Sequence, residues 1–300
     1  MKLLIFYGLY EGEKTIAPHA LGQLLTILAG HEVDVLILDD ASPSRVGEQT
    51  KAHFAGQGPG RIDVLRLEHS TGYRGSIDRM FSALQWVAQT GRTYDYVLRV
   101  DADIHFCRAD LAALFAPGRL PAQGIVGQPL VMRQRDFVQV LADVLPAGFR
   151  RHRTPDGKIE HQWELQRCRP VWWHTIGWRA LIHGFRGVIV PGSFIVIAGA
   201  TLAALHHRGW LDRPRKSLGL VFGDDTMLSI ATRAVGHPVI DVRTLLPDWS
   251  CSLFLVPATT AESVRTAGHY FIHPMKDAAW ANDLRQALPL EGANSAAKPR

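Results

Sequence analysis

Four short apolar runs, separated by segments with helical spacing, fill the first hundred residues, and this alternation limits the fold more than any other feature. The runs cover residues 3–7, 33–38, 62–67 and 94–100. The clearest helical pattern lies at 75–89, where apolar side chains recur every three or four positions. Alternating strands and helices are typical of a parallel sheet with helices on its faces. The sequence therefore predicts an α/β fold with a Rossmann-like, mostly parallel sheet flanked by helices.

The second half of the chain is less regular. Besides helices at 20–28 and 45–54, we expect strands at 125–127, 188–190, 194–197 and 239–242, helices at 136–145, 200–207 and 224–234, and a polar loop at 150–169. We expect one domain over residues 1–290, divided near residue 105. Residues 291–300 are poor in hydrophobic side chains, which predicts a disordered tail.

The composition excludes several classes of protein. The three cysteines are isolated, without the paired spacing of zinc sites or disulfide scaffolds, so we expect a reducing, cytoplasmic location. The apolar stretch 188–205 is interrupted by Pro191, Gly192 and Gly199, whereas a spanning helix needs about 20 apolar residues. We therefore expect a strand and a helix there, and no transmembrane segment.

Positive charge is concentrated between residues 150 and 216. This window holds twelve Lys or Arg and four Asp or Glu, and it also holds five of the eight tryptophans. A basic, Trp-rich segment is a candidate contact surface for an anionic partner. The alternative is a basic surface around a Trp-rich core.

Two carboxylates follow the apolar run 94–100, in the order Asp101-Ala102-Asp103. Open α/β sheets bind ligands beyond the carboxyl ends of their strands. Hard divalent cations prefer oxygen ligands and often share them with substrate phosphates. The pair is therefore a candidate site for Mn²⁺ or Mg²⁺ beside a diphosphate, and the alternative is a solvated loop.

Other polar residues follow the first strands in the same way. Asp39 and Asp40 come after the second run and could hold a ribose or a base, or could cap the next helix. Gly72 and Arg74 precede the helix at 75–89, where a helix N-terminus and a cation favour an anion. The sequence has neither GxxxxGK[ST] nor a strand–GxGxxG–helix pattern, which excludes a P-loop and disfavours a dinucleotide fold.

Two more candidates lie near the C-terminus of the chain. Asp224 and Asp225 follow Gly223 at the start of a predicted helix, where an Asp can be a cap or a general base. His273 could complete a metal site begun by carboxylates, although a lone His is more often structural. Lys276 could meet a phosphate as a point charge.

Taken in order, these motifs resemble the family-2-like glycosyltransferases of the GT-A (nucleotide-diphospho-sugar transferase) fold. The resemblance runs from residue 3 to about residue 276. It rests on the opening strand with the Asp39-Asp40-Ala41-Ser42 motif, the segment 72–79, the Asp101-Ala102-Asp103 motif, the strand 191–197, the Gly223-Asp224-Asp225 motif and His273.

The resemblance implies a metal-dependent, inverting and non-processive transfer of one sugar from a nucleotide-diphosphate sugar donor to an acceptor hydroxyl. It implies a nucleotide-binding half (1–105) and an acceptor-binding half (106–290) with the basic Trp-rich segment 150–186. The implied roles are Asp225 as the catalytic base; Asp101, Asp103 and His273 as ligands of Mn²⁺ or Mg²⁺; Tyr7, Asp39, Asp40, Gly72, Arg74, Asp101 and Lys276 as nucleotide-sugar contacts; and Asp224, Trp172 and Trp173 as acceptor contacts.

The sequence departs from this family in three places. Ser70-Thr71 stands where an Asn is frequent, the Gln-x-x-Arg-Trp motif and membrane helices of processive members are absent, and 150–186 has no counterpart. The acceptor is expected to be anionic, either a glycan or lipid-linked glycan or a modified base in nucleic acid. A peripheral membrane contact, a nucleotidyltransferase and a non-catalytic nucleotide-sugar-binding protein stay open as alternatives.

Overall fold

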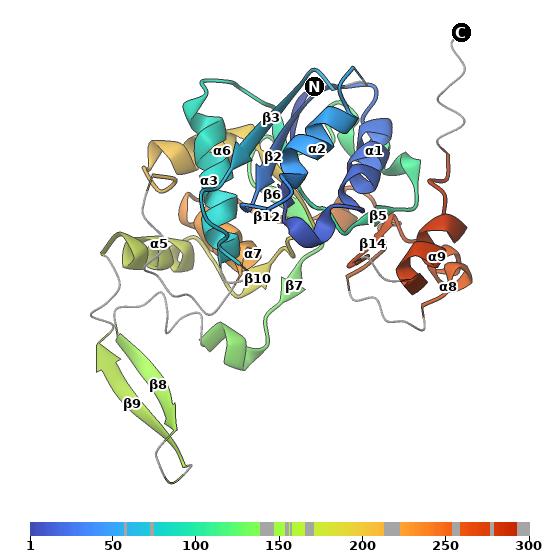
Figure 1. The fold of residues 1–300 in the computed structure, drawn as a ribbon. Coiled ribbons are helices and arrows are strands. Elements are labelled where there is room, and N and C mark those ends of the chain that lie inside the picture. The colour runs from blue at the N-terminus through green and yellow to red at the C-terminus, as the bar shows by residue number, and fades with distance from the viewer. Residues whose placement is uncertain are drawn as a thin grey trace.

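The computed structural model covers the whole chain (Figure 1) and describes residues 1–56, 59–72, 75–138, 147–153, 156, 158–165, 171–212, 223–253, 259–276 and 279–292, with the backbone alone for 147–153 and 159–165. No helix within these ranges is long and apolar enough to cross a membrane.

A seven-stranded sheet forms the centre of the structure. Its strand order is β12-β6-β11-β4-β1-β2-β3. The strands are β1 (Lys2–Leu9), β2 (Glu32–Asp39), β3 (Arg61–Arg66), β4 (Tyr96–Asp101), β6 (Ile125–Gly127), β11 (Phe194–Ala198) and β12 (Val239–Asp241). β11 runs antiparallel to both of its neighbours, and every other pairing in this sheet is parallel. The predicted α/β fold with a mostly parallel sheet is confirmed.

Helices cover both faces of the sheet, because successive side chains of a strand point to opposite faces. In β1, Leu3 and Ile5 pack in one core together with α1 (Ala17–Ile27), whereas Leu4 and Phe6 pack in the other core with α3 (Ser76–Gln89). The first core also takes in the start of α2 (Val46–His53), and the second takes in α5 (Val171–Ile182), α6 (Gly199–His207) and α7 (Asp224–Ala234).

A second, three-stranded sheet lies beside the end of β4, and the sequence did not predict it. It has the order β13-β14-β5, with β13 (Cys251–Ser252), β14 (Phe271–Ile272) and β5 (His105–Phe106). A small core packs this region against α8 (Ala261–Thr266) and α9 (Ala279–Ala287). Because β14 pairs with β5, the residues after Ile272 are brought back to the segment that follows β4.

Several short elements complete the described chain. They are the 3-10 helices η1 (Glu11–Glu13), η3 (Ala109–Phe115) and η4 (Val242–Thr244), the paired strands β7 (Leu130–Val131) and β10 (Val188–Ile189), and the hairpin of β8 (Ala147–Arg153) and β9 (Ile159–Leu165).

The hairpin corrects the predicted loop at 150–169. Its strands lie side by side below the body of the protein in Figure 1. In β9, Ile159, Trp163 and Leu165 alternate with Glu160, Gln162 and Glu164, a period of two that the prediction of a loop overlooked. Helix α5 was also missed. Of the helix predicted at 136–145, residues 136–138 are helical, in a helix that begins at residue 134. Residues 139–145 lie outside the described residues, as does the tail from 293.

Candidate active site

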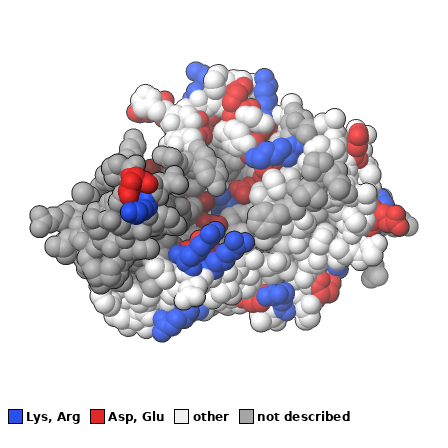
Figure 2. Space-filling model, turned by 90° about the horizontal axis from the view of Figure 1, so that it is seen from below, with Lys and Arg blue, Asp and Glu red and all other residues white. Residues whose placement is uncertain are grey.

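The carboxyl ends of the parallel strands gather acidic side chains at one edge of the central sheet. Gly8 of β1 lies opposite Asp101 of β4, and Leu9 lies opposite Asp39 of β2. The two predicted Asp motifs therefore flank the end of β1. Figure 2 looks onto this side of the molecule and shows acidic side chains inside a hollow, with Lys and Arg side chains around it.

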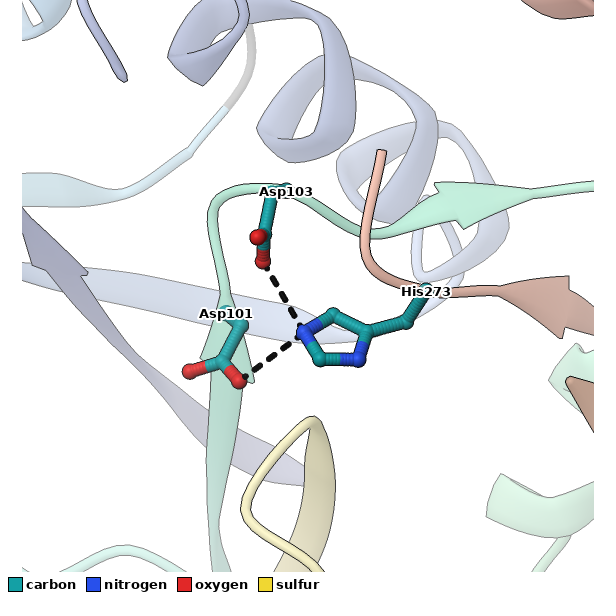
Figure 3. A group of neighbouring side chains, drawn as sticks. All are labelled: Asp101, Asp103 and His273. Atoms are coloured by element: carbon teal, nitrogen blue, oxygen red, sulfur yellow. Dashed lines mark ion pairs between the residues drawn. The ribbon is translucent and has the colours of Figure 1, made fainter. Parts of the chain in front are cut away.

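Asp101, Asp103 and His273 converge in this region (Figure 3), and one ligand atom of each lies within 4.8 Å of the others. His273 Nε2 is 3.0 Å from Asp103 Oδ1 and 3.5 Å from Asp101 Oδ2. Two carboxylate oxygens and an imidazole nitrogen are a donor set that suits a divalent cation such as Mn²⁺. The structure brings together all three residues of the predicted metal site, although they come from segments about 170 positions apart in sequence.

Lys276 adds a positive charge to the same cluster. Its Nζ lies 3.1 Å from Asp103 Oδ2 and 3.2 Å from the Tyr10 hydroxyl, and its side chain is 61% exposed. Burial by itself would raise the pKa of Asp103, but the hydrogen bond with His273 and the positive charges around it lower that pKa to about 2. Asp103 is therefore ionised at neutral pH, and Lys276 is in reach of an anion placed in the hollow.

Arg99 is the central cation of the site, and no sequence pattern indicated it because it lies inside an apolar strand. Its guanidinium is 3.0 Å from Asp101 Oδ1 and 2.7 Å from Asp224 Oδ2. The side chain is 13% exposed. Gly192 leaves room for it, since a Cβ at that position would lie 2.3 Å from Arg99 Nη1. Arg99 thus links the end of β4 to the start of α7.

Asp224 and Asp225 have different partners. Asp224 is held by Arg99, whereas Asp225 Oδ1 accepts a hydrogen bond from the Thr226 backbone N–H at the start of α7. Burial and the neighbouring Asp224 raise the pKa of Asp225, and Arg99 partly opposes that rise. A carboxylate with a raised pKa is suited to accept a proton.

Asp39 is a structural residue in this arrangement. It is fully buried, and its oxygens accept hydrogen bonds from Ser42 N, Ser42 Oγ and Gly47 N. A Cβ at position 47 would meet the Asp39 side chain at 3.0 Å, so α2 begins against this carboxylate. The structure therefore gives Asp39 the capping role that the sequence left open.

Asp40 orders the loop that contains Gly72. Its Oδ1 accepts hydrogen bonds from the backbone and hydroxyl of Thr71, and its Oδ2 contacts Ser70 Oγ and Arg79. Gly72 has a positive φ of 59°, which favours glycine, and its carbonyl accepts a hydrogen bond from Arg79. Asp40 therefore positions the Gly72 loop and Arg79.

A pocket connects these groups. Its lining includes Arg79, Arg99, Asp101 and Asp224, together with Gly8, Tyr10 and Glu13. It holds about 100 Å³, which is less than the roughly 300 Å³ of a typical small-molecule site. The pocket is thus the floor of the hollow, lined by one cation from α3 and one from β4.

Three other predicted contacts lie elsewhere. Tyr7 is fully buried, and its hydroxyl donates to the Ala17 carbonyl oxygen, so the phenol braces β1 against α1. Trp173 is fully buried in the second core, which corrects its prediction as an acceptor contact, and Trp172 is partly buried against the same core. Arg74 lies outside the described residues.

Glu13 is a buried acid beside the site that the sequence did not single out. It is 5% exposed, and its Oε2 accepts a hydrogen bond from the Tyr10 backbone N–H. Burial, together with the negative charges of Asp103 and Asp101, raises the pKa of Glu13 to about 9. Glu13 is therefore protonated at neutral pH.

Replacing Glu13 with glutamine should stabilise the metal-free protein at pH 8 and leave its stability near pH 4 unchanged. The folded state holds this proton up to about pH 9, whereas an unfolded Glu releases it near 4.5, so the parent loses stability as pH rises between these values. The expected gain at pH 8 is on the order of a few kcal/mol. Thermal unfolding in EDTA at both pH values measures it, and an equal effect at both would contradict the raised pKa.

Among known proteins, no family model and no curated sequence matches this chain. Solved structures do match. The mannosyltransferase PcManGT from Pyrobaculum calidifontis, in complex with GDP-Man and Mn²⁺, aligns with 80% of this chain and 54% of its own at 18% identity and a TM-score of 0.42. The bifunctional glycosyltransferase WbbM aligns with 96% of this chain and 49% of its own at 11% identity and a TM-score of 0.49.

Residues 1–349 of S. aureus TarS align with 96% of this chain and 69% of their own at 14% identity and a TM-score of 0.41. The chain spans about half the length of PcManGT and of WbbM. Two of these three structures are named as sugar transferases, the class that the sequence motifs resemble.

Proposed function

We propose that this protein is a glycosyltransferase that moves one sugar from a nucleotide-diphosphate sugar to an acceptor hydroxyl with the help of Mn²⁺ or Mg²⁺. The observation that carries the proposal is the convergence of Asp101, Asp103 and His273 within 4.8 Å at the carboxyl edge of the sheet. Arg99 and Asp224 connect this cluster to the neighbouring Asp225, a half-buried candidate for the general base.

The carboxylates and the imidazole would hold the cation, which when bound supplies positive charge to the diphosphate as a Lewis acid. Lys276 and Arg79 are placed to contribute further positive charge to a diphosphate in the hollow. The Gly72 loop, ordered by Asp40, offers a close backbone approach to the nucleotide.

Asp225 would complete the reaction from the acceptor side. It takes the proton of the acceptor hydroxyl while that oxygen forms a bond to the anomeric carbon and the bond from this carbon to the diphosphate oxygen breaks. Attack opposite the leaving group gives inversion. The proton ends on Asp225, and the electron pair leaves with the nucleoside diphosphate.

The acceptor is proposed to be anionic, such as a lipid-linked glycan. This rests on the excess of Lys and Arg between residues 150 and 216. The observed burial removes Trp173 from the acceptor surface and leaves that role to other residues of the segment.

The proposal is tested by incubating the protein with a panel of nucleotide sugars, Mn²⁺ and an anionic lipid-linked glycan as acceptor, and identifying the products. Free nucleoside diphosphate together with a sugar–acceptor adduct supports it. Pyrophosphate would indicate a nucleotidyltransferase, and no product with any donor would indicate a binding protein; either result overturns the proposal. Thermal shifts with nucleoside diphosphates, with and without Mn²⁺, select the donor class beforehand.

Replacing Arg99 with methionine should slow transfer about 10- to 100-fold and move the acidic limb of the pH–rate profile to higher pH. Arg99 lowers the pKa of both Asp101 and Asp225, so both carboxyls gain protons more readily without it. Loss of a buried partner also costs roughly 3–5 kcal/mol of stability.

Lysine at position 99 provides the matched control, because it keeps the charge but cannot contact two carboxylates with one planar fork. Its acidic limb should lie closer to that of the parent than the limb of the methionine variant. Steady-state rates between pH 5 and 9 measure both, and an unshifted limb in Arg99→Met would show that Arg99 does not lower the pKa of these carboxyls.

A further inference from the structure

Large exposed hydrophobic side chains gather on two neighbouring segments. Of the six such side chains among the described residues, five lie at 131–138 or 171–182: Val131, Val138, Val171, Trp178 and Ile182. Single exposed hydrophobic residues are ordinary, but a contiguous group marks a contact surface. We call these two segments, together with the turn at 183–187, the α5 surface.

The outer face of α5 is apolar along its whole length. Val171, Trp178 and Ile182 are 81%, 52% and 75% exposed, and with exposed Thr175 between them they recur every three or four positions. This spacing places them in one stripe. The opposite face is buried through Trp173, Ile176, Gly177 and Ala180 against the second core. The side chains of the stripe therefore do not pack in the core of the domain.

The segment 131–138 lies directly beside the C-terminal end of α5. The Met132 backbone N–H donates to the Gly187 carbonyl oxygen at 2.9 Å, and the rings of Phe137 and Phe185 lie 6.0 Å apart. Val131 pairs with Val188 in the two-residue ladder of β7 and β10. The exposed Val131 and Val138 thus extend the stripe across a second element.

The polar residues of the α5 surface are mainly cationic. The segments 131–138 and 171–187 contain four arginines and one aspartate, a net charge of +3. Arg133, Arg135 and Arg186 are exposed. Arg186 donates to the Leu181 and Phe185 carbonyls, so its cation lies at the end of the apolar stripe.

We propose that the α5 surface docks on an anionic lipid membrane. Apolar and Trp side chains beside arginines are the pattern of helices that lie in the membrane interface, where the cations meet the headgroups. A two-fold contact between copies of this chain would oppose the same arginines across the interface, which disfavours a dimer through this face.

The location of this surface fits a membrane-bound acceptor. In Figure 1, α5 and β7 lie on the lower side of the sheet, away from the N-terminus, where β1 starts. The carboxyl end of β1 lies on the same lower side. The inference goes beyond the proposed function, because docking requires neither donor, metal nor acceptor.

The test is cosedimentation of the protein with vesicles of phosphatidylcholine, alone or mixed with phosphatidylglycerol. The protein should bind the mixed vesicles at least about tenfold more tightly, and salt should weaken this binding. Trp178→Ser with Ile182→Ser should lose about tenfold or more, because the two side chains no longer insert.

Charge reversal separates the electrostatic contribution to vesicle binding from the apolar contribution. Arg133→Glu with Arg135→Glu should lower binding to the mixed vesicles towards the level of phosphatidylcholine alone, while Lys51→Glu, exposed on α2, should leave binding unchanged. Circular dichroism and melting curves confirm that each variant is folded. Three results would each overturn the inference: no binding to the mixed vesicles, binding by Trp178→Ser/Ile182→Ser equal to that of the parent, or a parent dimer that this variant dissociates. Transfer assays would still test the proposed function independently.

Discussion

Replacing Asp225 with asparagine should lower the rate of sugar transfer about 10²- to 10⁴-fold, the range that a positioned general base contributes. Asparagine keeps the shape of the side chain and an oxygen for the Thr226 N–H, so the start of α7 should persist. It cannot take the acceptor proton. Initial rates with saturating donor and Mn²⁺ measure the loss, and Asp283→Asn, exposed on α9, is the control.

The pH dependence of the parent should report the same group. Because burial and Asp224 raise the pKa of Asp225 above its ordinary value of 3.8, transfer should fall on acidification with a midpoint above that value. The Asn variant should lose the contribution of Asp225 to this limb, while that of Asp101 remains. Near-normal turnover by Asp225→Asn would assign the base to another residue.

Replacing Asp103 with asparagine should remove metal-dependent nucleotide binding as well as transfer. Asp103 is 6% exposed and ionised, and it contacts both His273 and Lys276, so it supplies much of the negative charge that a cation would meet. Loss of a cation that contributes several kcal/mol corresponds to a decrease of about 10²- to 10⁴-fold in rate.

The two variants together distinguish the metal from the base. Thermal shifts with a nucleoside diphosphate should depend on Mn²⁺ in the parent and in Asp225→Asn, but not in Asp103→Asn. His273→Gln should weaken the metal response in the same direction. A full Mn²⁺ response in Asp103→Asn would place the cation elsewhere, whatever the rate of transfer.

Local sequence patterns predicted much of the central sheet and half of the site. Apolar runs with helical segments between them define β1, β2, β3 and β4 within a few residues, because strand and helix periodicity is encoded in neighbouring positions. Asp101 and Asp225 could be found in the same way, since the carboxyl end of a strand and the first turn of a helix are recognisable sites for such side chains.

Several of the remaining elements have too little local pattern. The two-residue strands β5 and β14 contain no period, and they exist through their pairing with each other across more than 160 positions. Helix α5 is apolar on both faces, so its pattern does not indicate which side is buried. The basic composition of its neighbourhood suggested an acceptor platform that included Trp173, whereas packing buried that ring.

The sequence by itself determined the order of strands and helices and the positions of the carboxylates at their ends, because both depend on residues close together in the chain. Only the tertiary structure decided which of these groups meet. It placed His273 against Asp103, paired Arg99 with Asp101 and Asp224, and set the buried Asp39 against Ser42. The physical reason is that ion pairs, burial and the resulting pKa shifts depend on distances across the folded core, which local periodicity does not specify.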